Sequence, residues 1–153
     1  MKRFWLLALL SLSCATTPAP APATAAAAPT PPPPPQKLFD RLGGKPAIEA
    51  VVDDFLGRVA GDERINASFA GAHLPRLRTR LVEQICQAAG GPCVYSGRDM
   101  KTVHAGMGIT SAQFDALAGH LVAALDKFKV PEKEKGALLS VVGPMKPAIV
   151  EEP

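Results

Sequence analysis

The chain contains three histidines, and His104 stands in the most distinctive setting. It lies in the run MKTVHAGMGI, residues 100–109, where apolar side chains and two glycines surround it. An imidazole nitrogen that a short segment presents to an apolar space is suited to ligating a metal, haem iron in particular. A surface histidine, or a core histidine with satisfied hydrogen bonds, is the alternative. The residues around His104 leave both possibilities open.

Cys86 and Cys93 bracket the sequence CQAAGGPC. The GGP between them is a chain-reversal signal, so the two thiols can approach closely. We favour a disulfide, which an exported protein permits. It would stabilise the fold by about 2–3 kcal/mol at most, because its loop is short. Two free thiols or a metal pair are the alternatives, although two cysteines alone make a poor zinc site.

The first 14 residues have the features of a signal peptide. Two basic residues precede a short apolar stretch, residues 4–12, which is too short to span a bilayer. The following sequence SCA resembles a lipoprotein processing site and makes Cys14 a candidate lipidated N-terminus. Simple cleavage among the alanines a little further along the chain is the alternative.

Residues 15–36 are rich in Ala, Pro and Thr and include five consecutive prolines. Such a segment cannot bury a core and favours an extended, semi-rigid spacer. Its role would be to hold residues 37–153, the globular domain, away from a membrane surface. We therefore expect an exported protein of the periplasm or cell envelope, tethered to a membrane by its N-terminal lipid.

The net charge of the whole chain is +3. From Lys37 onward the chain has 15 basic and 14 acidic side chains, since the leader supplies the other two basic residues. This balance argues against nucleic-acid binding, which requires a basic surface. A local group of arginines, Arg76, Arg78 and Arg80, is either a solvated helix face or a site for a ligand that bears carboxylates.

Apolar residues recur every three or four positions through most of the domain, as in amphipathic helices. These stripes place Leu74, Phe128 and Val141 among the inward-facing residues. No strand pattern, repeat or nucleotide-binding motif is evident, so the expected class is all-α. We predict helices over 45–60, 74–89, 110–128 and 131–149, with one helical turn over 100–104 and a kink or fraying near Pro144 and Pro147.

From Leu38 to about Val150 the chain resembles the group I truncated haemoglobins. The matching stretches are LFDRLGGKPAIEAVVDDFLGRV, INASFAG, GGPCVYSGRDMKTVHAGMGIT and FDALAGHLVAAL. The glycine pairs at 43–44 and 90–91 also stand where that family has them. The resemblance implies a globin-like, two-over-two helical sandwich around haem b, which is iron protoporphyrin IX.

The resemblance also gives roles to single residues. His104 matches the proximal iron ligand, and Phe69 matches the aromatic residue that packs flat on the porphyrin. Arg80, Tyr95 and Lys101 are candidates for pairing with the haem propionates, because hydrogen bonds to carboxylates favour such donors. The residues expected to line the haem or its pocket are Phe55, Leu77, Leu81, Val103, Met107, Ile109, Phe114 and Leu117.

The distal side of the iron departs from the family pattern. Leu56 stands where relatives that hold oxygen tightly have a tyrosine, and Leu77 and Leu81 stand where a glutamine is frequent. A charge-assisted donor would stabilise bound O2 by roughly 1.5–3 kcal/mol. We therefore expect faster dissociation of O2, a smaller stabilisation of bound O2 relative to bound CO, and less restrained autoxidation.

Three other polar residues bear on this distal pocket. Gln84 lies seven residues after Leu77 on nearly the same helical face and is either a donor to the ligand or solvated. His73, just before the distal helix, is an alternative sixth ligand. His120 is expected to be structural.

These features predict a haem protein that reversibly binds O2, NO or CO outside the cytoplasm, for oxygen binding or transport or for NO handling. A redox enzyme, such as an NO dioxygenase or a peroxidase, is an alternative that needs an external electron donor; the apolar distal side argues against it. A third possibility is a non-haem helical lipoprotein that binds another ligand or a partner. The presence of both His104 and Phe69 argues against this possibility.

Overall fold

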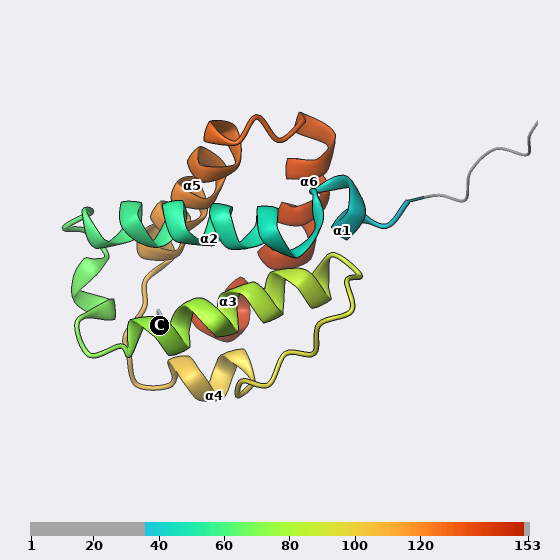
Figure 1. Cartoon of the computed structure of the whole chain (residues 1–153). Helices are drawn as coiled ribbons and strands as arrows, with labels where there is room; N and C mark the ends of the chain where they lie inside the picture. The colour runs from blue at the N-terminus through green and yellow to red at the C-terminus, as the bar shows by residue number, and fades with distance from the viewer. Residues whose placement is uncertain (1–35, 152–153) are drawn as a thin grey trace, which may run out of the picture. The chain divides into compact units, whose positions relative to one another are not determined.

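The computed structural model describes residues 36–151, whose regular structure is entirely helical (Figure 1). The predicted signal peptide with Cys14, and all of the predicted linker except Gln36, lie outside these residues. Within the described part, no helix is long and apolar enough to cross a membrane. The α-helices are α1 (Leu38–Arg41), α2 (Gly44–Ala60), α3 (Leu74–Ala88), α4 (Met100–His104), α5 (Ser111–Lys127), α6 (Glu132–Val142) and α7 (Lys146–Ile149), with 3₁₀ helices η1 (Asn66–Phe69) and η2 (Gly143–Met145).

The prediction of an all-α, two-over-two sandwich is confirmed. Helix α2 packs against both α3 and α5, and α3 packs against α6 (Figure 1). Each buried aliphatic or aromatic side chain of this core stabilises the fold by about 1.5–3 kcal/mol. The buried residues of the core are Ile48, Val51, Val52, Phe55 and Val59 of α2, Ile65 before η1, Val82, Ile85 and Cys86 of α3, Leu121, Ala124 and Leu125 of α5, and Leu138 of α6.

Side-chain caps begin three of the helices. Thr110 and Gln113 form a reciprocal capping box at the start of α5, as the sequence around Thr110 suggests. Asp99 accepts a hydrogen bond from the backbone N–H of Thr102 and caps α4. The Nδ1 of His73 accepts a 3.3 Å hydrogen bond from the backbone N–H of Arg76 and caps α3. These caps satisfy backbone N–H groups that have no partner inside the helix.

The prediction of a helix over 131–149 with a kink near the two prolines agrees with the structure, which is helical from Glu132 to Ile149. The chain forms α6, then the single 3₁₀ turn η2, then α7. Pro144 lies in η2 and Pro147 lies in α7. Proline has no N–H to donate and its ring clashes with the preceding turn, so the α-helical hydrogen-bond pattern is interrupted here. The chain accommodates Pro144 with one 3₁₀ turn and then continues as α7, which is the predicted kink.

Three residues predicted to face inward are exposed. Leu74 is 55% exposed, Phe128 is 43% exposed and Val141 is 37% exposed. Leu74 is the first residue of α3 and Phe128 is the C-cap of α5, so both stand at helix ends beyond the main packing surface. Val141 lies in the last turn of α6, next to the break at Gly143.

Candidate functional site

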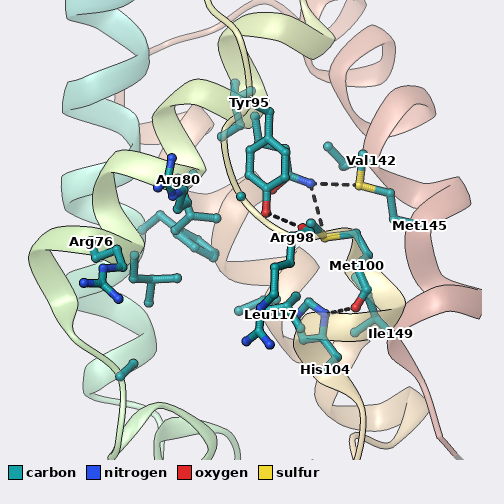
Figure 2. A pocket seen from close by; sticks show the side chains of 18 of the residues that line it. Arg76, Arg80, Tyr95, Arg98, Met100, His104, Leu117, Val142, Met145 and Ile149 are labelled. Atoms are coloured by element: carbon teal, nitrogen blue, oxygen red, sulfur yellow. Dashed lines mark hydrogen bonds between the residues drawn. The ribbon is translucent and has the colours of Figure 1, made fainter.

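A cavity of about 690 Å³ opens between α3 and α4 and extends to α5 and the segment after α6 (Figure 2). Its volume falls in the range of small-molecule and cofactor sites, roughly 300–1,000 Å³. Most of the lining is apolar, and the polar groups gather at the α3 side and in the loop before α4. The apolar side chains are Phe55, Leu77, Leu81, Ile85, Met100, Val103, Phe114, Leu117, Leu121, Val142, Met145 and Ile149.

His104 is the last residue of α4 and lines this cavity. Its Nδ1 lies 2.7 Å from the backbone oxygen of Met100, one helical turn earlier (Figure 2). A carbonyl oxygen only accepts, so Nδ1 carries the proton and donates it to this bond. The other nitrogen, Nε2, then has a free lone pair, which is the form of imidazole that binds a metal.

Three arginines line the cavity at its solvent-exposed edge. Arg76 and Arg80 come from α3, and Arg98 comes from the loop that precedes α4 (Figure 2). Arg80 also pairs with Glu83 at 2.8 Å. Arginine guanidinium groups at the mouth of an apolar cavity suit a ligand that buries an apolar body and leaves carboxylates near the surface. Of the arginine group in α3, Arg78 points elsewhere and pairs with Asp53.

The loop between α3 and α4 forms one wall of the cavity and is joined to α3 at several points. A disulfide connects Cys86 of α3 with Cys93 in the loop. The backbone N–H of Tyr95 donates to the side chain of Gln87 at 2.6 Å. Ser96 donates to Glu83 from its N–H and its hydroxyl, and these bonds lower the pKa of the Glu83 carboxyl. The wall is therefore held by covalent and hydrogen bonds to the opposite helix.

Tyr95, which the sequence suggests as a partner of the haem propionates, lines the cavity. Its hydroxyl donates to the backbone oxygen of Arg98 at 2.9 Å. Burial raises the pKa of the Tyr95 phenol, so the group stays protonated near neutral pH. The single phenol proton is thus engaged within the loop, and the nearby arginines are the better partners for a carboxylate.

The structure brings most of the predicted pocket residues together, but not all of them. Phe69 and Leu56 pack against the hydrophobic core and are not among the residues that line the cavity. Lys101 is exposed on α4, and Met107 is 44% exposed beyond the end of that helix. The predicted residues that line the cavity are His104, Phe55, Leu77, Leu81, Arg80, Gln84, Tyr95, Val103, Phe114 and Leu117.

Ile109 also lies outside the lining of the cavity. It follows Gly108, where the chain has left α4, and its backbone oxygen accepts a 2.9 Å hydrogen bond from the N–H of Glu151. Helix α4 ends at His104, so Ile109 lies in the non-helical segment that follows it. Met107 and Ile109 therefore belong to the segment after α4, which does not line the cavity.

Gln84 is partly buried, and its side-chain amide has hydrogen-bond partners in the structure. Its Nε2 lies 3.1 Å from the sulfur of Met145 and 3.4 Å from the sulfur of Met100. The amide donor is thus directed at two thioethers, which are weak acceptors. His73 also lines the cavity, with its Nδ1 engaged in the cap of α3.

Sequence reasoning missed several residues of the site. Arg98 and Met100 precede the predicted iron ligand His104 by six and four residues and could have been found by this closeness along the chain. Met145 and Ile149 come from η2 and α7, and nothing in their local sequence indicates that this segment returns to the cavity.

Comparison with known proteins assigns the family. The model of the bacterial-like globin family matches residues 37–151. The group 1 truncated haemoglobin GlbN of Mycolicibacterium paratuberculosis is 41% identical over 112 residues, which are 73% of this chain and 82% of the relative. The chain belongs to the group 1 truncated haemoglobins. A second GlbN, from Nostoc sp., is 39% identical over 115 residues and matches over 75% of this chain and 98% of its own length.

Solved truncated haemoglobins share the fold. The Fe(III) form of the Tetrahymena pyriformis protein superposes with a TM-score of 0.73 at 26% identity, and the match covers 76% of this chain and all of that one. The 2/2 haemoglobin of Synechococcus, whose structure is described with covalently attached haem, has a TM-score of 0.67 at 29% identity. That match covers 71% of this chain and 91% of the Synechococcus chain.

Truncated haemoglobins are haem-based, gas-binding globins, and the cofactor of this chain is haem b. The residues of the cavity fit this group. The cavity offers an apolar volume for the porphyrin, an imidazole with one nitrogen free for iron, and guanidinium groups for the two propionates.

Proposed function

We propose that the protein holds haem b in this cavity with His104 as the proximal iron ligand, and that it reversibly binds O2, NO or CO. The observation that carries the proposal is the hydrogen bond from His104 Nδ1 to the Met100 carbonyl, which leaves Nε2 free on the wall of an apolar cavity. Bound haem would supply an iron with one coordination position for a diatomic gas. Arg76, Arg80 and Arg98 would hold the propionates at the mouth.

The lining of the cavity supports an apolar distal pocket. Leu77 and Leu81 present no donor, and the amide of Gln84 is directed at the sulfurs of Met100 and Met145. A bound O2 would gain no strong hydrogen bond from these side chains. We therefore propose gas binding with ready release of O2, and NO handling or oxygen transport in preference to tight oxygen storage.

The proposal is tested by His104→Ala in the full-length protein. We expect the unchanged protein to show a Soret band that shifts when CO is added after reduction. In the variant we expect haem content to fall close to background, because the iron loses its protein ligand. His73→Ala is the matched control, since His73 also lines the cavity, and it should keep its haem. Normal haem content and spectra in His104→Ala would show that the proximal assignment is wrong.

We also propose that the protein acts outside the cytoplasm, anchored to a membrane by a lipid on Cys14. The support is in the first 36 residues: a basic pair, a short apolar stretch, the SCA sequence and a proline-rich spacer. A spacer of this composition would keep the haem domain at a distance from the membrane while leaving it tethered. Gas binding would then take place at the cell envelope.

A further inference from the structure

The helix that carries His104 is too short to hold itself in place. Helix α4 has five residues, so it amounts to little more than one turn. Isolated helices of this length are unstable in water, because nucleation costs more than a single turn returns. The side chain of Asp99 caps its start, but its end at Ala105 leads directly into an extended residue. The position of His104 therefore depends on what holds the segment that follows.

Glu151 holds that segment. Its Oε1 accepts a 2.8 Å hydrogen bond from the N–H of Gly106, and its Oε2 accepts a 2.7 Å hydrogen bond from the N–H of Gly108. Its own backbone N–H donates to the carbonyl of Ile109 at 2.9 Å. Three hydrogen bonds thus join Glu151, two residues after the end of α7, to the five residues that follow His104.

The glycines make this arrangement possible. Gly106 has a φ of 77° and Gly108 has a φ of 62°, in the left-handed region that side chains rarely adopt. This backbone turns two N–H groups toward one carboxylate. The hydrogen bonds from Gly106 and Gly108 lower the pKa of the Glu151 carboxyl, so the group is ionised at neutral pH and its bonds are charge-assisted.

Helix α7 completes the link between Glu151 and the cavity. It packs against α4, and its last residue, Ile149, lines the cavity beside His104 (Figure 2). The segment that presents Glu151 to the glycines therefore also forms part of the cavity wall. A displacement of this segment would move both the wall and the end of α4.

We propose that Glu151 is a positioning residue for the proximal histidine: its carboxylate clamps Gly106 and Gly108 and thereby sets where His104 meets the iron. This inference rests on the proposed function, because it concerns the same iron site. Glu151 itself is not among the residues that line the cavity. It acts through the 105–109 segment.

The test compares Glu151→Ala, Glu151→Gln and the control Glu63→Gln in the full-length, haem-loaded protein. Alanine removes both acceptors, whereas glutamine keeps one acceptor oxygen. Glu63 is an exposed glutamate in the turn after α2, remote in sequence from α4. Three quantities are measured: amide hydrogen exchange at Gly106 and Gly108, the iron–histidine stretching band of the reduced protein, and the rate of haem transfer to an excess of a haem-scavenging apoprotein.

We expect the amide hydrogens of Gly106 and Gly108 to exchange about tenfold faster in Glu151→Ala than in the unchanged protein. We also expect a shifted or broadened iron–histidine band and haem loss that is about threefold faster or more. Glu151→Gln should fall between Glu151→Ala and the unchanged protein, and Glu63→Gln should match the unchanged protein. If Glu151→Ala fails to fold, the glutamine variant carries the test.

Two outcomes overturn the inference alone. Unchanged amide exchange in both Glu151 variants would show that the clamp does not hold the segment. Faster exchange with an unchanged iron–histidine band and haem loss would show that the clamp is structural and does not position His104. A different result, in which the unchanged protein takes up no haem or shows no iron–histidine band, would refute the proposed function together with this inference.

Discussion

His104 and Gln84 both line the cavity, and the hydrogen bonds of each side chain determine which of its atoms remain available to a ligand. The bond from His104 Nδ1 to a carbonyl leaves a nitrogen available for iron. The amide of Gln84 is directed at the sulfurs of Met100 and Met145, so it is turned away from the role of a donor to a gas ligand. A hydrogen bond within the protein thus leaves His104 able to bind iron, whereas it directs the amide of Gln84 away from a gas ligand.

This difference predicts the effects of two substitutions on oxygen release. Leu81→Gln places an amide donor in the apolar part of the cavity, and we expect the O2 dissociation rate to fall about tenfold, the effect of one hydrogen bond of about 1.4 kcal/mol. Gln84→Leu should change the rate less than about twofold. Stopped-flow measurement of O2 dissociation checks both. A large acceleration in Gln84→Leu would show that Gln84 does reach the ligand.

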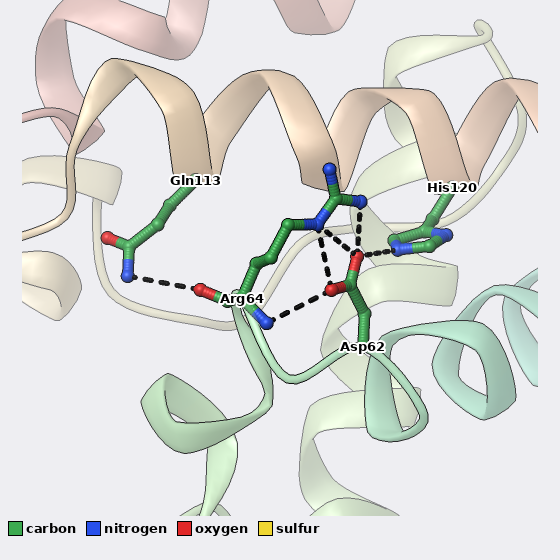
Figure 3. A network of polar contacts seen from close by, with 4 residues as sticks. All are labelled: Asp62, Arg64, Gln113 and His120. Atoms are coloured by element: carbon green, nitrogen blue, oxygen red, sulfur yellow. Dashed lines mark hydrogen bonds and ion pairs between the residues drawn. The ribbon is translucent and has the colours of Figure 1, made fainter.

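At the scale of elements, an ion-pair network joins the end of α2 to α5. Asp62 follows the C-cap of α2, and its Oδ2 lies 2.6 Å from Nε2 of His120 on α5 (Figure 3). Arg64 donates to both oxygens of the same carboxylate. Gln113 of α5 donates to the backbone oxygen of Arg64 at 3.5 Å. The expected structural role of His120 agrees with this arrangement, which connects two helices that share the core.

The network predicts a pH-dependent contribution to stability. Hydrogen bonds from Arg64 and then His120 hold the pKa of Asp62 well below its ordinary value of 3.8. The carboxylate therefore stabilises the fold at all pH values above 3.8, and this contribution is lost as the pH falls toward the lower folded-state value. We expect Asp62→Asn to lower the free energy of unfolding near neutral pH, and the difference from the unchanged protein to shrink in acid.

Urea unfolding measured at neutral pH and at several acidic pH values checks this expectation. Asp40→Asn, at an exposed position in α1, is the matched control and should stay close to the unchanged protein at every pH. A difference between Asp62→Asn and the unchanged protein that stays constant into strong acid would contradict the role of the ionised carboxylate.

At the scale of the whole molecule, the chain combines a haem domain with an N-terminal region of different composition. Residues 1–36 contain no Asp or Glu, whereas the rest of the chain carries 14 acidic side chains. Among the helices that the structure describes, none could cross a membrane. The membrane anchor that we propose is the lipid on Cys14 in the N-terminal region.

Lipidation is tested by labelling cells with a radioactive fatty acid. We expect label in the unchanged protein and none in Cys14→Ser, because only an N-terminal cysteine thiol of this kind accepts the lipid. The double variant Cys86→Ser, Cys93→Ser is the matched control, since it removes the other two cysteines of the chain, and it should keep its label. Label that persists in Cys14→Ser would refute the proposed anchor.

Prediction from the sequence was most accurate where structure depends on nearby residues. The limits of α2, α3 and α5 were predicted to within one residue or so, because an apolar stripe and a capping residue such as Thr110 act within a few turns of the helix. The short turn over 100–104 was also predicted correctly. The helix over 131–149 with its kink near the prolines was predicted as well, because the effect of a proline on the turn before it is local.

The residues predicted for the candidate site also fall into two groups, those that line the cavity and those that do not. His104, Leu77 and Leu81 were named from their local setting and the family resemblance, and all three line the cavity. Phe69 and Leu56 were named on the same grounds, yet both side chains pack against the core. Apolar residues on adjacent parts of a helix can face either the core or the cavity, and a helical period alone does not distinguish these two surroundings.

The sequence by itself determined the all-helical class, the main helices and the closeness of Cys86 to Cys93, because each depends on residues near one another in the chain. The candidate iron ligand needed the family resemblance as well as the local setting of His104. Only the tertiary structure decided which distant side chains meet. Gln84 reaches Met145 across 61 positions, and Glu151 reaches Gly106 across 45 positions. Such contacts depend on the path of the whole chain after α6, which no local pattern specifies. The environment of the proximal histidine is therefore a property of the packed molecule.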